Sequence, residues 1–220
     1  MKVSFLQQFL SYLFPVKITF APGKTTPVLG LYRFRGRWQL SAATAIYSDG
    51  AAYRPLTEAF ARLKKELPAK KNMLVLGAGL GSAVSVLHKM NSTISDTTLV
   101  DIDPQVIGWG KEIIDAEQQN QYQWISADVR DFVTAEKKLY DLIIVDVFQD
   151  RIVPGFVSSA DFLKSCRQLM SANKAALVLN YIINNEASWK QAQATIEQLF
   201  AVEHIIAIGI NRILILRNNA

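Results

Sequence analysis

The chain has 220 residues, of which 50% are hydrophobic and 20% charged, so it is long and apolar enough for one globular domain with a sizeable core. Its formal net charge is +5, and the basic residues are scattered along the chain. This distribution indicates solvated surface residues rather than a phosphate-binding patch, so we expect no nucleic-acid partner. A single cysteine, Cys166, excludes an internal disulfide and favours a reducing compartment, which we take to be the cytoplasm.

The N-terminal stretch MKVSFLQQFLSYLFPV has no small-residue cleavage pattern, and its apolar run is too short to span a bilayer. Five apolar residues recur there at helical spacing: Phe5, Leu6, Phe9, Leu10 and Leu13. This pattern predicts a short amphipathic helix that packs on the body of the protein or on a second subunit. We prefer this interpretation to attachment at a membrane surface, and expect no membrane partner; a homodimer through this region is compatible with the sequence.

Residues 16–48 are rich in β-forming side chains, and Gly23 and Gly36 mark turns, with RFRGRW at the tip of a hairpin. A helical stretch, LTEAFARLKKEL, follows. We therefore divide the chain into residues 1–54, an N-terminal helix with a small β-sheet, and residues 55–220, the main domain.

From residue 72 onward, apolar strands alternate with helices, which predicts a mostly parallel sheet covered on both faces. The predicted strands are MLVLG, TTLVDI, YQWIS, DLIIVDV, AALVLNY, HIIAIGI and RILILRN. Only a turn near Gly209 separates the last two, so they must pair antiparallel. The expected fold class is α/β, a Rossmann-like doubly wound sheet of seven strands with an antiparallel last strand, beside the small N-terminal β-rich region.

The first strand of this region runs into the glycine loop GAGLGS, with Gly77, Gly79 and Gly81. A dinucleotide fingerprint would continue with glycine or alanine where this chain has Ser82. The Gly-x-Gly-x-Gly version is the one expected where a loop binds S-adenosylmethionine. Structural turns produce similar patterns, so the loop alone is weak evidence.

An aspartate ends or follows each of the next three strands: Asp101, Asp128 and Asp146. Asp101 has the position of an acid that binds ribose hydroxyls. The alternative is that Asp101 or Asp103 caps the following helix, and Asp103, directly before Pro104, fits the cap better. Asp128 is placed to accept a hydrogen bond from an adenine amino group.

The carboxyl ends of parallel strands meet at one crevice, so these three carboxylates should converge. Three negative charges in a basic protein favour a cationic ligand, such as a sulfonium nucleoside. We add Ile102 and Val129, which follow Asp101 and Asp128, to the predicted binding set, and we predict no metal site.

Four stretches, NMLVLGAGLGSAVSVLHK, TLVDIDPQVI, ADVRDFV and YDLIIVDVFQD, together resemble the spermidine synthase family within the class I S-adenosylmethionine-dependent methyltransferase superfamily. The resemblance extends over residues 49–181 and includes SDGAAY. It implies that the cofactor is S-adenosylmethionine or its decarboxylated form. It also implies catalytic roles for Tyr53, Asp146 and Asp150.

The chain departs from the family pattern at positions that recognise amines. Where the family's Gly-Gly-Gly-Asp-Gly-Gly loop has an aspartate for the propylamine end of the decarboxylated donor, this chain has Leu80. SAATA, YRP and DVFQDR stand where the family has Asp-Gly-x-x-Gln, Tyr-His-Glu and Asp-Ser-Ser-Asp-Pro. We therefore include Leu80 in the binding set as a residue that disfavours the decarboxylated donor. S-adenosylmethionine itself remains compatible, because its amino-acid tail can be held by the loop backbone.

The leading hypothesis is a spermidine-synthase-like methyltransferase acting on a small-molecule or amine-bearing acceptor that the sequence does not identify. Methyl transfer from a sulfonium is a direct displacement that relies on alignment and desolvation. Asp146 would orient or deprotonate an acceptor amine, and FQDRIVPGF would form a loop over the site. One alternative is a divergent polyamine aminopropyltransferase that uses the decarboxylated donor. Another is a catalytically silent nucleotide-binding module.

Overall fold

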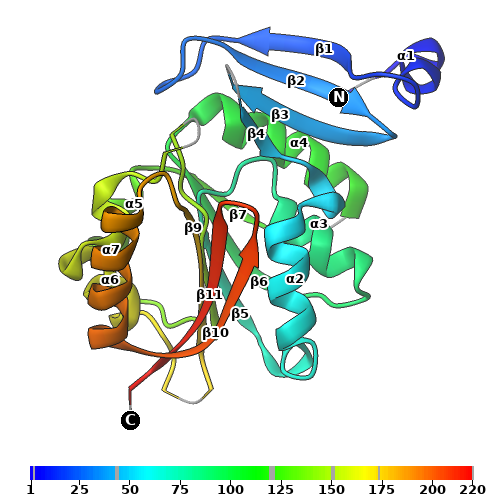
Figure 1. The fold of residues 1–220 in the computed structure, drawn as a ribbon. Helices are drawn as coiled ribbons and strands as arrows, with labels where there is room; N and C mark the ends of the chain where they lie inside the picture. The colour runs from blue at the N-terminus through cyan, green and yellow to red at the C-terminus, as the bar shows by residue number, and fades with distance from the viewer. Residues whose placement is uncertain (2, 43–44, 119–121, 150–151, 173, 220) are drawn as a thin grey trace.

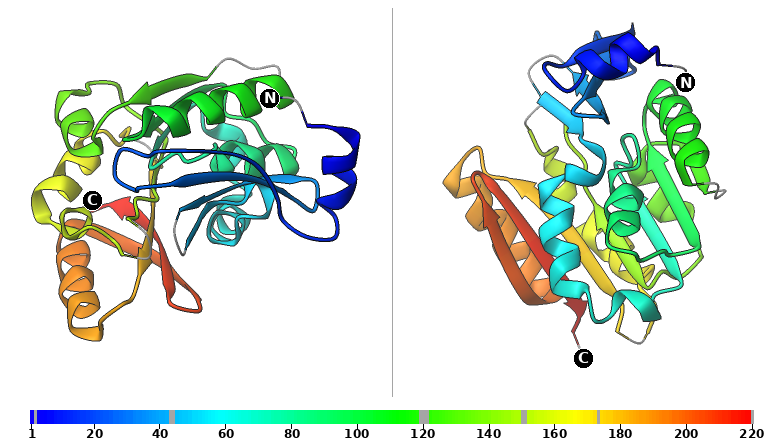
Figure 2. Two further views of the ribbon diagram at one scale, coloured as in Figure 1. Left: turned by 90° about the horizontal axis from the view of Figure 1, so that it is seen from above. Right: turned by 90° about the vertical axis from the view of Figure 1, so that its right-hand side faces the viewer.

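Two β-sheets and the helices around the larger one make up the molecule (Figure 1). The computed structural model describes the whole chain except residues 2, 43–44, 119–121, 150–151, 173 and 220. The smaller sheet comes first in the chain and lies across one end of the main sheet (Figures 1 and 2).

The N-terminal sheet is antiparallel, and its strands follow one another in chain order. Its strands are β1 (Val16–Ala21), β2 (Leu29–Phe34), β3 (Arg37–Ala42) and β4 (Ala45–Ser48). A two-residue turn joins β2 to β3, with Arg35 at φ 50° and Gly36 at φ 71°. Positive φ at both central residues matches the twist of a two-residue hairpin, so the predicted hairpin tip at RFRGRW is confirmed.

A short helix, α1 (Phe5–Leu10), precedes this sheet and begins with a capping box between Ser4 and Gln7. The helix was predicted, but the expectation that its apolar face packs on the body is wrong. No residue of α1 is buried, and Phe5 and Phe9 are 89% and 59% exposed. Its polar side meets the sheet instead, because Gln8 Oε1 accepts a hydrogen bond from Arg33 Nε at 3.1 Å.

The main sheet has the order β10-β11-β9-β8-β5-β6-β7, which confirms the predicted seven strands. Its strands are β5 (Asn72–Leu76), β6 (Asp96–Asp101), β7 (Gln123–Ser126), β8 (Leu142–Val145), β9 (Ala176–Ile182), β10 (Phe200–Ile208) and β11 (Asn211–Asn218). Strand β11 lies between β9 and β10 and runs antiparallel to both. Its pairing with β10 confirms the prediction from the short turn. Central strands such as β8 are buried throughout, whereas β10, at the edge, alternates between more and less exposed positions.

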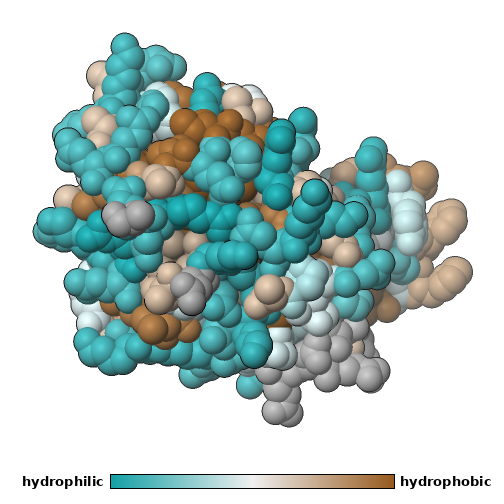
Figure 3. Space-filling model, turned by 90° about the horizontal axis from the view of Figure 1, so that it is seen from below, coloured by the Kyte–Doolittle hydropathy of each residue, from teal (hydrophilic) through white to brown (hydrophobic). Residues whose placement is uncertain are grey.

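Three helices cover each face of the main sheet (Figures 1 and 2). On one face these are α2 (Arg54–Leu63), α3 (Ser82–Lys89) and α4 (Pro104–Gln118), and on the other α5 (Val129–Ala135), α6 (Ala160–Gln168) and α7 (Glu186–Leu199). Short 3-10 segments lie at η1 (Gly50–Ala52), η2 (Leu67–Ala69) and η3 (Gly155–Ser158). Seen from the side opposite the N-terminal sheet, the surface is mostly hydrophilic, with hydrophobic side chains gathered in separate patches (Figure 3).

The N-terminal sheet is attached to the main domain through a separate apolar cluster. Leu31 and Leu40 of the small sheet pack there with Trp109 and Ile113 of α4. This packing places the small sheet over the carboxyl ends of the parallel strands, where the predicted ligand residues lie. The boundary between residues 54 and 55 stays a prediction.

Within the described part of the chain, every helix is too short or too polar to cross a membrane. Histidine, cysteine and acidic side chains form no group of three able to hold a metal ion among those same residues.

Candidate active site

The glycine loop leaves β5 and passes directly against the end of β8. Gly77 has φ +84°, and a Cβ at this position would lie 2.3 Å from the carbonyl oxygen of Asp146. Gly81, at φ +81°, precedes α3, where a Cβ would lie 2.8 Å from the Ile114 side chain. Only glycine fits both the backbone conformation and the space, so the loop stays close to the strand ends.

Asp101, the last residue of β6, turns its carboxylate toward this loop. Its Oδ2 accepts a hydrogen bond from the Gly79 backbone N–H at 2.9 Å, and its Oδ1 accepts one from the Asp103 N–H at 3.1 Å. Burial raises the pKa of Asp101, and these backbone donors partly offset the increase. A carboxylate has about four acceptor positions, so the fixed group can still accept from a neighbouring hydroxyl.

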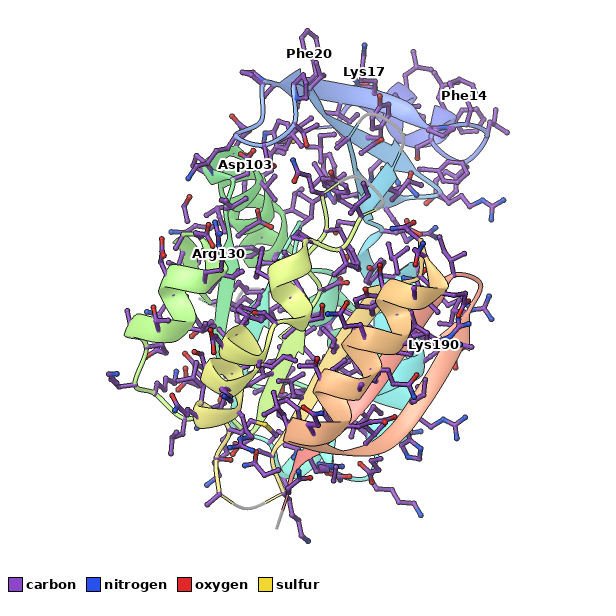
Figure 4. The ribbon with its side chains drawn as sticks, turned by 60° about the vertical axis from the view of Figure 1, so that its left-hand side comes forward. Phe14, Lys17, Phe20, Asp103, Arg130 and Lys190 are labelled. Atoms are coloured by element: carbon purple, nitrogen blue, oxygen red, sulfur yellow. The ribbon has the colours of Figure 1, made fainter. Side chains whose placement is uncertain are left out.

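Asp103 has a structural role, as the alternative interpretation of this segment proposed. Its Oδ1 accepts from the backbone N–H of Gln105 at 2.9 Å and of Val106 at 3.4 Å, which caps α4. Its Oδ2 accepts from the Lys24 N–H at 2.6 Å and so holds the loop between β1 and β2 against the main domain. Figure 4 shows Asp103 at this junction between the two sheets.

Asp128 caps α5 and also forms an ion pair that the sequence analysis did not anticipate. Its Oδ1 accepts from the Arg130 backbone N–H at 2.9 Å, and its Oδ2 lies 2.6 Å from Arg130 Nη2. Arg130 lowers the pKa of Asp128 through these hydrogen bonds. The guanidinium also lies over the Phe156 ring, 5.0 Å from its centroid. Asp128 is therefore paired rather than a free acceptor for an adenine amino group.

Asp146 follows β8 and is the centre of a small polar network. Its Oδ1 accepts hydrogen bonds from Asn180 Nδ2 at 2.8 Å and from the Tyr53 hydroxyl at 3.1 Å. Asn180 Nδ2 also lies 3.2 Å from the Tyr53 oxygen, and Asn211 Nδ2 donates to Asn180 Oδ1 at 2.9 Å.

Burial raises the pKa of Asp146 to about 6, against the lowering effect of Asn180 and Tyr53. Burial and the nearby Asp146 charge also raise the pKa of Tyr53, so the phenol stays protonated and donates to the carboxylate. A carboxylate with a pKa near neutrality and a fixed orientation can accept a proton from a substrate.

A cavity of about 380 Å³ joins these groups, and its volume is within the roughly 300–1,000 Å³ typical of small-molecule sites. From the predicted set, its wall contains Gly77, Gly79, Asp101, Ile102, Asp128, Val129 and Asp146. The expected convergence of the three carboxylates is thus present, although Arg130 neutralises one of them. Tyr53 does not line the cavity, and it contacts the site through its hydrogen bond to Asp146.

The N-terminal sheet forms a part of the wall that was not predicted. Thr25, Thr26, Leu29, Leu40 and Tyr47 line the cavity, although they lie far from the strand ends in sequence. Thr26 is only 5% exposed, and its Oγ1 has no hydrogen-bond partner among the described residues. A buried hydroxyl without a partner is costly, which fits a wall built to contact a polar ligand.

The Leu80 side chain does not line the cavity that contains the three carboxylates. Its side chain is 3% exposed and belongs to the apolar cluster that joins the N-terminal sheet to α4. With Trp38 and Ile113 it borders a different cavity, of about 180 Å³. In this conformation Leu80 can reach a nucleotide only through its backbone, which corrects the premise that its side chain meets the donor's tail.

The loop after β8 contributes Phe148, Gln149, Pro154 and Phe156 to the cavity wall. Gln149 and Ile152 form a backbone bridge, and the Phe156 ring packs edge-to-face on Phe162 with centroids 5.2 Å apart. The predicted position of this loop over the site is thus supported. Asp150, the third predicted catalytic residue, lies outside the described residues.

Two other site residues were missed by the sequence analysis. Asn180 is a buried amide within the apolar strand β9. A polar residue inside an apolar strand usually has a hydrogen-bond partner, so its position could have marked it as a site residue. Arg130 gave no comparable signal, because single basic residues on helices usually lie on solvated surfaces.

The chain matches the family model described as the spermine/spermidine synthase domain over residues 57–210. Among curated proteins, it is 27% identical over 134 residues to the polyamine aminopropyltransferase of Chromobacterium violaceum. That alignment covers 60% of this chain and 49% of the relative, so the matched region spans about half of the relative's length.

Solved structures share the fold at low sequence identity. A probable spermidine synthase from Corynebacterium glutamicum aligns over 90% of this chain and 79% of its own, with a TM-score of 0.73 and 19% identity. Human methyltransferase-like protein 13, in complex with SAH, aligns over 74% of this chain and 79% of its own, with a TM-score of 0.62 and 21% identity. These similarities show that the chain shares its fold with both proteins.

Proposed function

Because the chain belongs to the spermine/spermidine synthase family, we propose that it transfers an aminopropyl group from decarboxylated S-adenosylmethionine to a polyamine. This choice reverses the order of the first two of the three hypotheses drawn from the sequence, in which methyl transfer came first. The single observation that carries the proposal is the network around Asp146, which gives an amine acceptor a buried carboxylate with a pKa of about 6.

The residues of the cavity wall fit an adenosine-bearing donor. Asp101 would accept hydrogen bonds from the two ribose hydroxyls, and the unpartnered Thr26 hydroxyl offers a further polar contact. Val129 and Phe156 provide apolar surface for a base. The donor, when bound, supplies an alkyl group on a sulfonium centre.

The chain's own residues would prepare the acceptor. An amine must lose a proton before its nitrogen can attack, and Asp146 is the group placed to take that proton. Tyr53 and Asn180 hold the carboxylate in one orientation, since both donate to the same oxygen, Oδ1. The loop that contains Phe148 and Phe156 would exclude water from the cavity.

Methyl transfer from S-adenosylmethionine remains the second candidate, and Leu80 is the observation in its favour. The glycine loop offers no carboxylate at position 80, so the ammonium of a decarboxylated donor would need another partner. We retain a small-molecule or amine-bearing acceptor, a homodimer and a cytoplasmic location as proposals.

A thermal-shift screen distinguishes these candidates. The purified protein is heated with S-adenosylmethionine, its decarboxylated form, S-adenosylhomocysteine or methylthioadenosine, because a ligand that binds the native state raises the melting temperature. The proposal predicts the largest increase with the decarboxylated donor or methylthioadenosine. A larger increase with S-adenosylmethionine or S-adenosylhomocysteine would favour methyl transfer, and no increase with any of them would contradict both.

A further inference from the structure

Helix α1 presents its apolar side to solvent and its polar side to the protein. Phe5, Leu6 and Phe9 are 89%, 64% and 59% exposed. On the opposite side, Gln8 accepts from Arg33, and the Ser11 carbonyl accepts a hydrogen bond from the Arg35 N–H at 2.6 Å. A helix stabilised by internal packing has the reverse orientation. The apolar side of α1 is therefore available to contact another molecule.

The same surface continues through the segment after α1 and along β1. Leu13 and Phe14 are 69% and 49% exposed, and Phe20 is 66% exposed. A register shift between Lys17 and Thr19 brings Lys17 to the same side as Phe20, with its Nζ 5.4 Å from the ring centroid. Phe14, Lys17 and Phe20 point away from the body at one edge of the molecule (Figure 4).

We call this surface the N-terminal apolar face and define it by one cation and six apolar side chains: Lys17, Phe5, Leu6, Phe9, Leu13, Phe14 and Phe20. In Figure 3 hydrophobic side chains are visible at the right-hand edge, on the side where α1 lies in Figure 1. Several exposed aromatic and aliphatic side chains in one continuous segment mark an interaction site rather than ordinary surface.

The charge of the segment that carries this face has one sign. The first 48 residues contain six basic residues and no aspartate or glutamate, although the whole chain has 19 acidic residues. Three of the six, Arg33, Arg35 and Arg37, belong to the hairpin that supports α1. The remaining residues, from Asp49 on, have slightly more acidic than basic side chains. The net positive charge of the protein is thus concentrated in the segment that carries this face, although Arg37 pairs with Asp49 and Arg33 bonds to Gln8.

We propose that the N-terminal apolar face binds the surface of a membrane that contains anionic phospholipids. An amphipathic helix rich in Phe and Leu inserts its apolar side at the boundary between headgroups and acyl chains, and basic residues beside it are attracted to anionic headgroups. The polar side of α1 already faces the protein, so the helix can lie in the membrane plane without rearrangement. No spanning helix is required.

A second copy of the chain fits this face less well. In a symmetric dimer the same surface of each copy would meet, and like charges opposite one another in an interface are unfavourable. Asp49 already pairs with Arg37 of its own chain, and the first 48 residues provide no further acidic side chain for the basic residues of a second copy. Charge complementarity therefore favours an anionic lipid surface over a second subunit. This proposal reverses the expectation from the sequence that the protein has no membrane partner.

The test is co-sedimentation of the purified full chain with vesicles of phosphatidylcholine, with or without phosphatidylglycerol. The native protein should bind the anionic vesicles at least about tenfold more strongly than the neutral ones, because each basic residue near the surface contributes roughly fivefold. Phe9→Ser with Leu13→Ser should weaken binding to anionic vesicles by at least about tenfold. Lys17→Glu should weaken it about fivefold or more.

Matched substitutions elsewhere on the surface provide the controls. Ile205→Ser with Ile210→Ser removes two side chains that are 44% and 52% exposed in the main domain, and Lys190→Glu reverses a charge on α7, remote from the N-terminal face in Figure 4. Both controls should bind as the native protein does. The altered residues are all exposed, so circular dichroism should show unchanged folding.

Two results would overturn the proposal. The first is native protein that does not sediment with anionic vesicles, or that binds neutral vesicles equally well. The second is a dimer, seen by sedimentation velocity without lipid, that Phe9→Ser with Leu13→Ser converts to a monomer. That result would assign the face to a second copy of the chain.

Discussion

At the scale of single residues, the site depends on how burial and hydrogen bonds act on two aspartates. Burial raises the pKa of both Asp101 and Asp146, but their partners differ. Backbone N–H groups hold both oxygens of Asp101, which suits a fixed acceptor for hydroxyl groups. Side chains hold one oxygen of Asp146, and this arrangement suits a group that gains and loses a proton.

Asn180→Ala should move the acidic limb of the pH–activity profile to higher pH. The amide lowers the pKa of Asp146 from what burial alone would give, so removing it raises that pKa above about 6. The expected shift is about one to two pH units, because a hydrogen bond to a charged group contributes roughly 1.5–3 kcal/mol and one unit corresponds to about 1.4 kcal/mol. The measurement is kcat/KM for release of the nucleoside product from pH 5 to pH 9.

Asn211→Ala is the matched control, since Asn211 bonds to Asn180 and not to Asp146. It should shift the acidic limb of the pH–activity profile less than Asn180→Ala does. Equal profiles for native protein and Asn180→Ala would mean that Asp146 does not control the rate.

Raised pKa values also predict how stability depends on pH. In the native state Asp146 titrates near 6, above its ordinary value of 3.8, so the folded protein loses stability as the pH rises from about 4 through about 6. Asp146→Asn should remove this loss. Its free energy of unfolding, measured with urea at pH 7.5, should therefore exceed that of the native protein, whereas at pH 4 the two should be similar. A less stable variant at pH 7.5 would contradict the raised pKa.

Asp101→Ala should weaken binding of methylthioadenosine by about 2 kcal/mol or more, because two charge-assisted hydrogen bonds to the ribose are lost. Asp128→Ala should cost less, since Arg130 already engages that carboxylate. Calorimetry on the three proteins gives the comparison. Unchanged affinity in both variants would remove the nucleotide assignment.

At the scale of secondary-structure elements, the sequence predicted what depends on local pattern. The parallel strand β8 is an unbroken apolar run, and β5 is one after Asn72. The turn after β5 needs glycine for both space and φ. The three carboxylates could be placed because strand ends converge by topology alone. The site as a whole was thus predictable where it rests on the ends of regular strands.

Other features depend on tertiary packing, which local pattern does not contain. The apolar period of α1 identified the helix but not which side faces the protein. Thr26 and Tyr47 were missed because a contact between the small sheet and the strand ends joins distant parts of the chain. The direction of the Leu80 side chain depends on its packing in the cluster with Trp38. The glycine-loop motif contains no information about that packing.

Leu80→Asp tests that placement. A carboxylate in this apolar cluster would lack a partner, so the free energy of unfolding should fall by about 3 kcal/mol or more. Leu80→Met, of similar volume, should cost less than about 1.5 kcal/mol. Urea unfolding measures both. A Leu80→Asp protein of native stability that binds the decarboxylated donor more tightly would show that this side chain reaches the ligand after all.

At the scale of the whole molecule, the small sheet has two faces with different roles. Its inner side packs on α4 and completes the cavity wall, and the bond from the Lys24 N–H to Asp103 holds it there. Its outer edge carries α1 (Figure 1) and the exposed Phe20 (Figure 4). The small sheet therefore connects the cavity wall to the surface that carries α1.

The most direct measurement of the central claim is the identity of the nucleoside that the protein releases. The native chain and Asp146→Asn are each incubated with both donors and putrescine, and the products are identified by mass spectrometry. Our account predicts methylthioadenosine and an aminopropylated amine from the decarboxylated donor with the native chain, and at least about a hundredfold slower formation with Asp146→Asn, as expected for loss of a general base. Release of S-adenosylhomocysteine from S-adenosylmethionine instead, or equal rates for the two proteins, would contradict it.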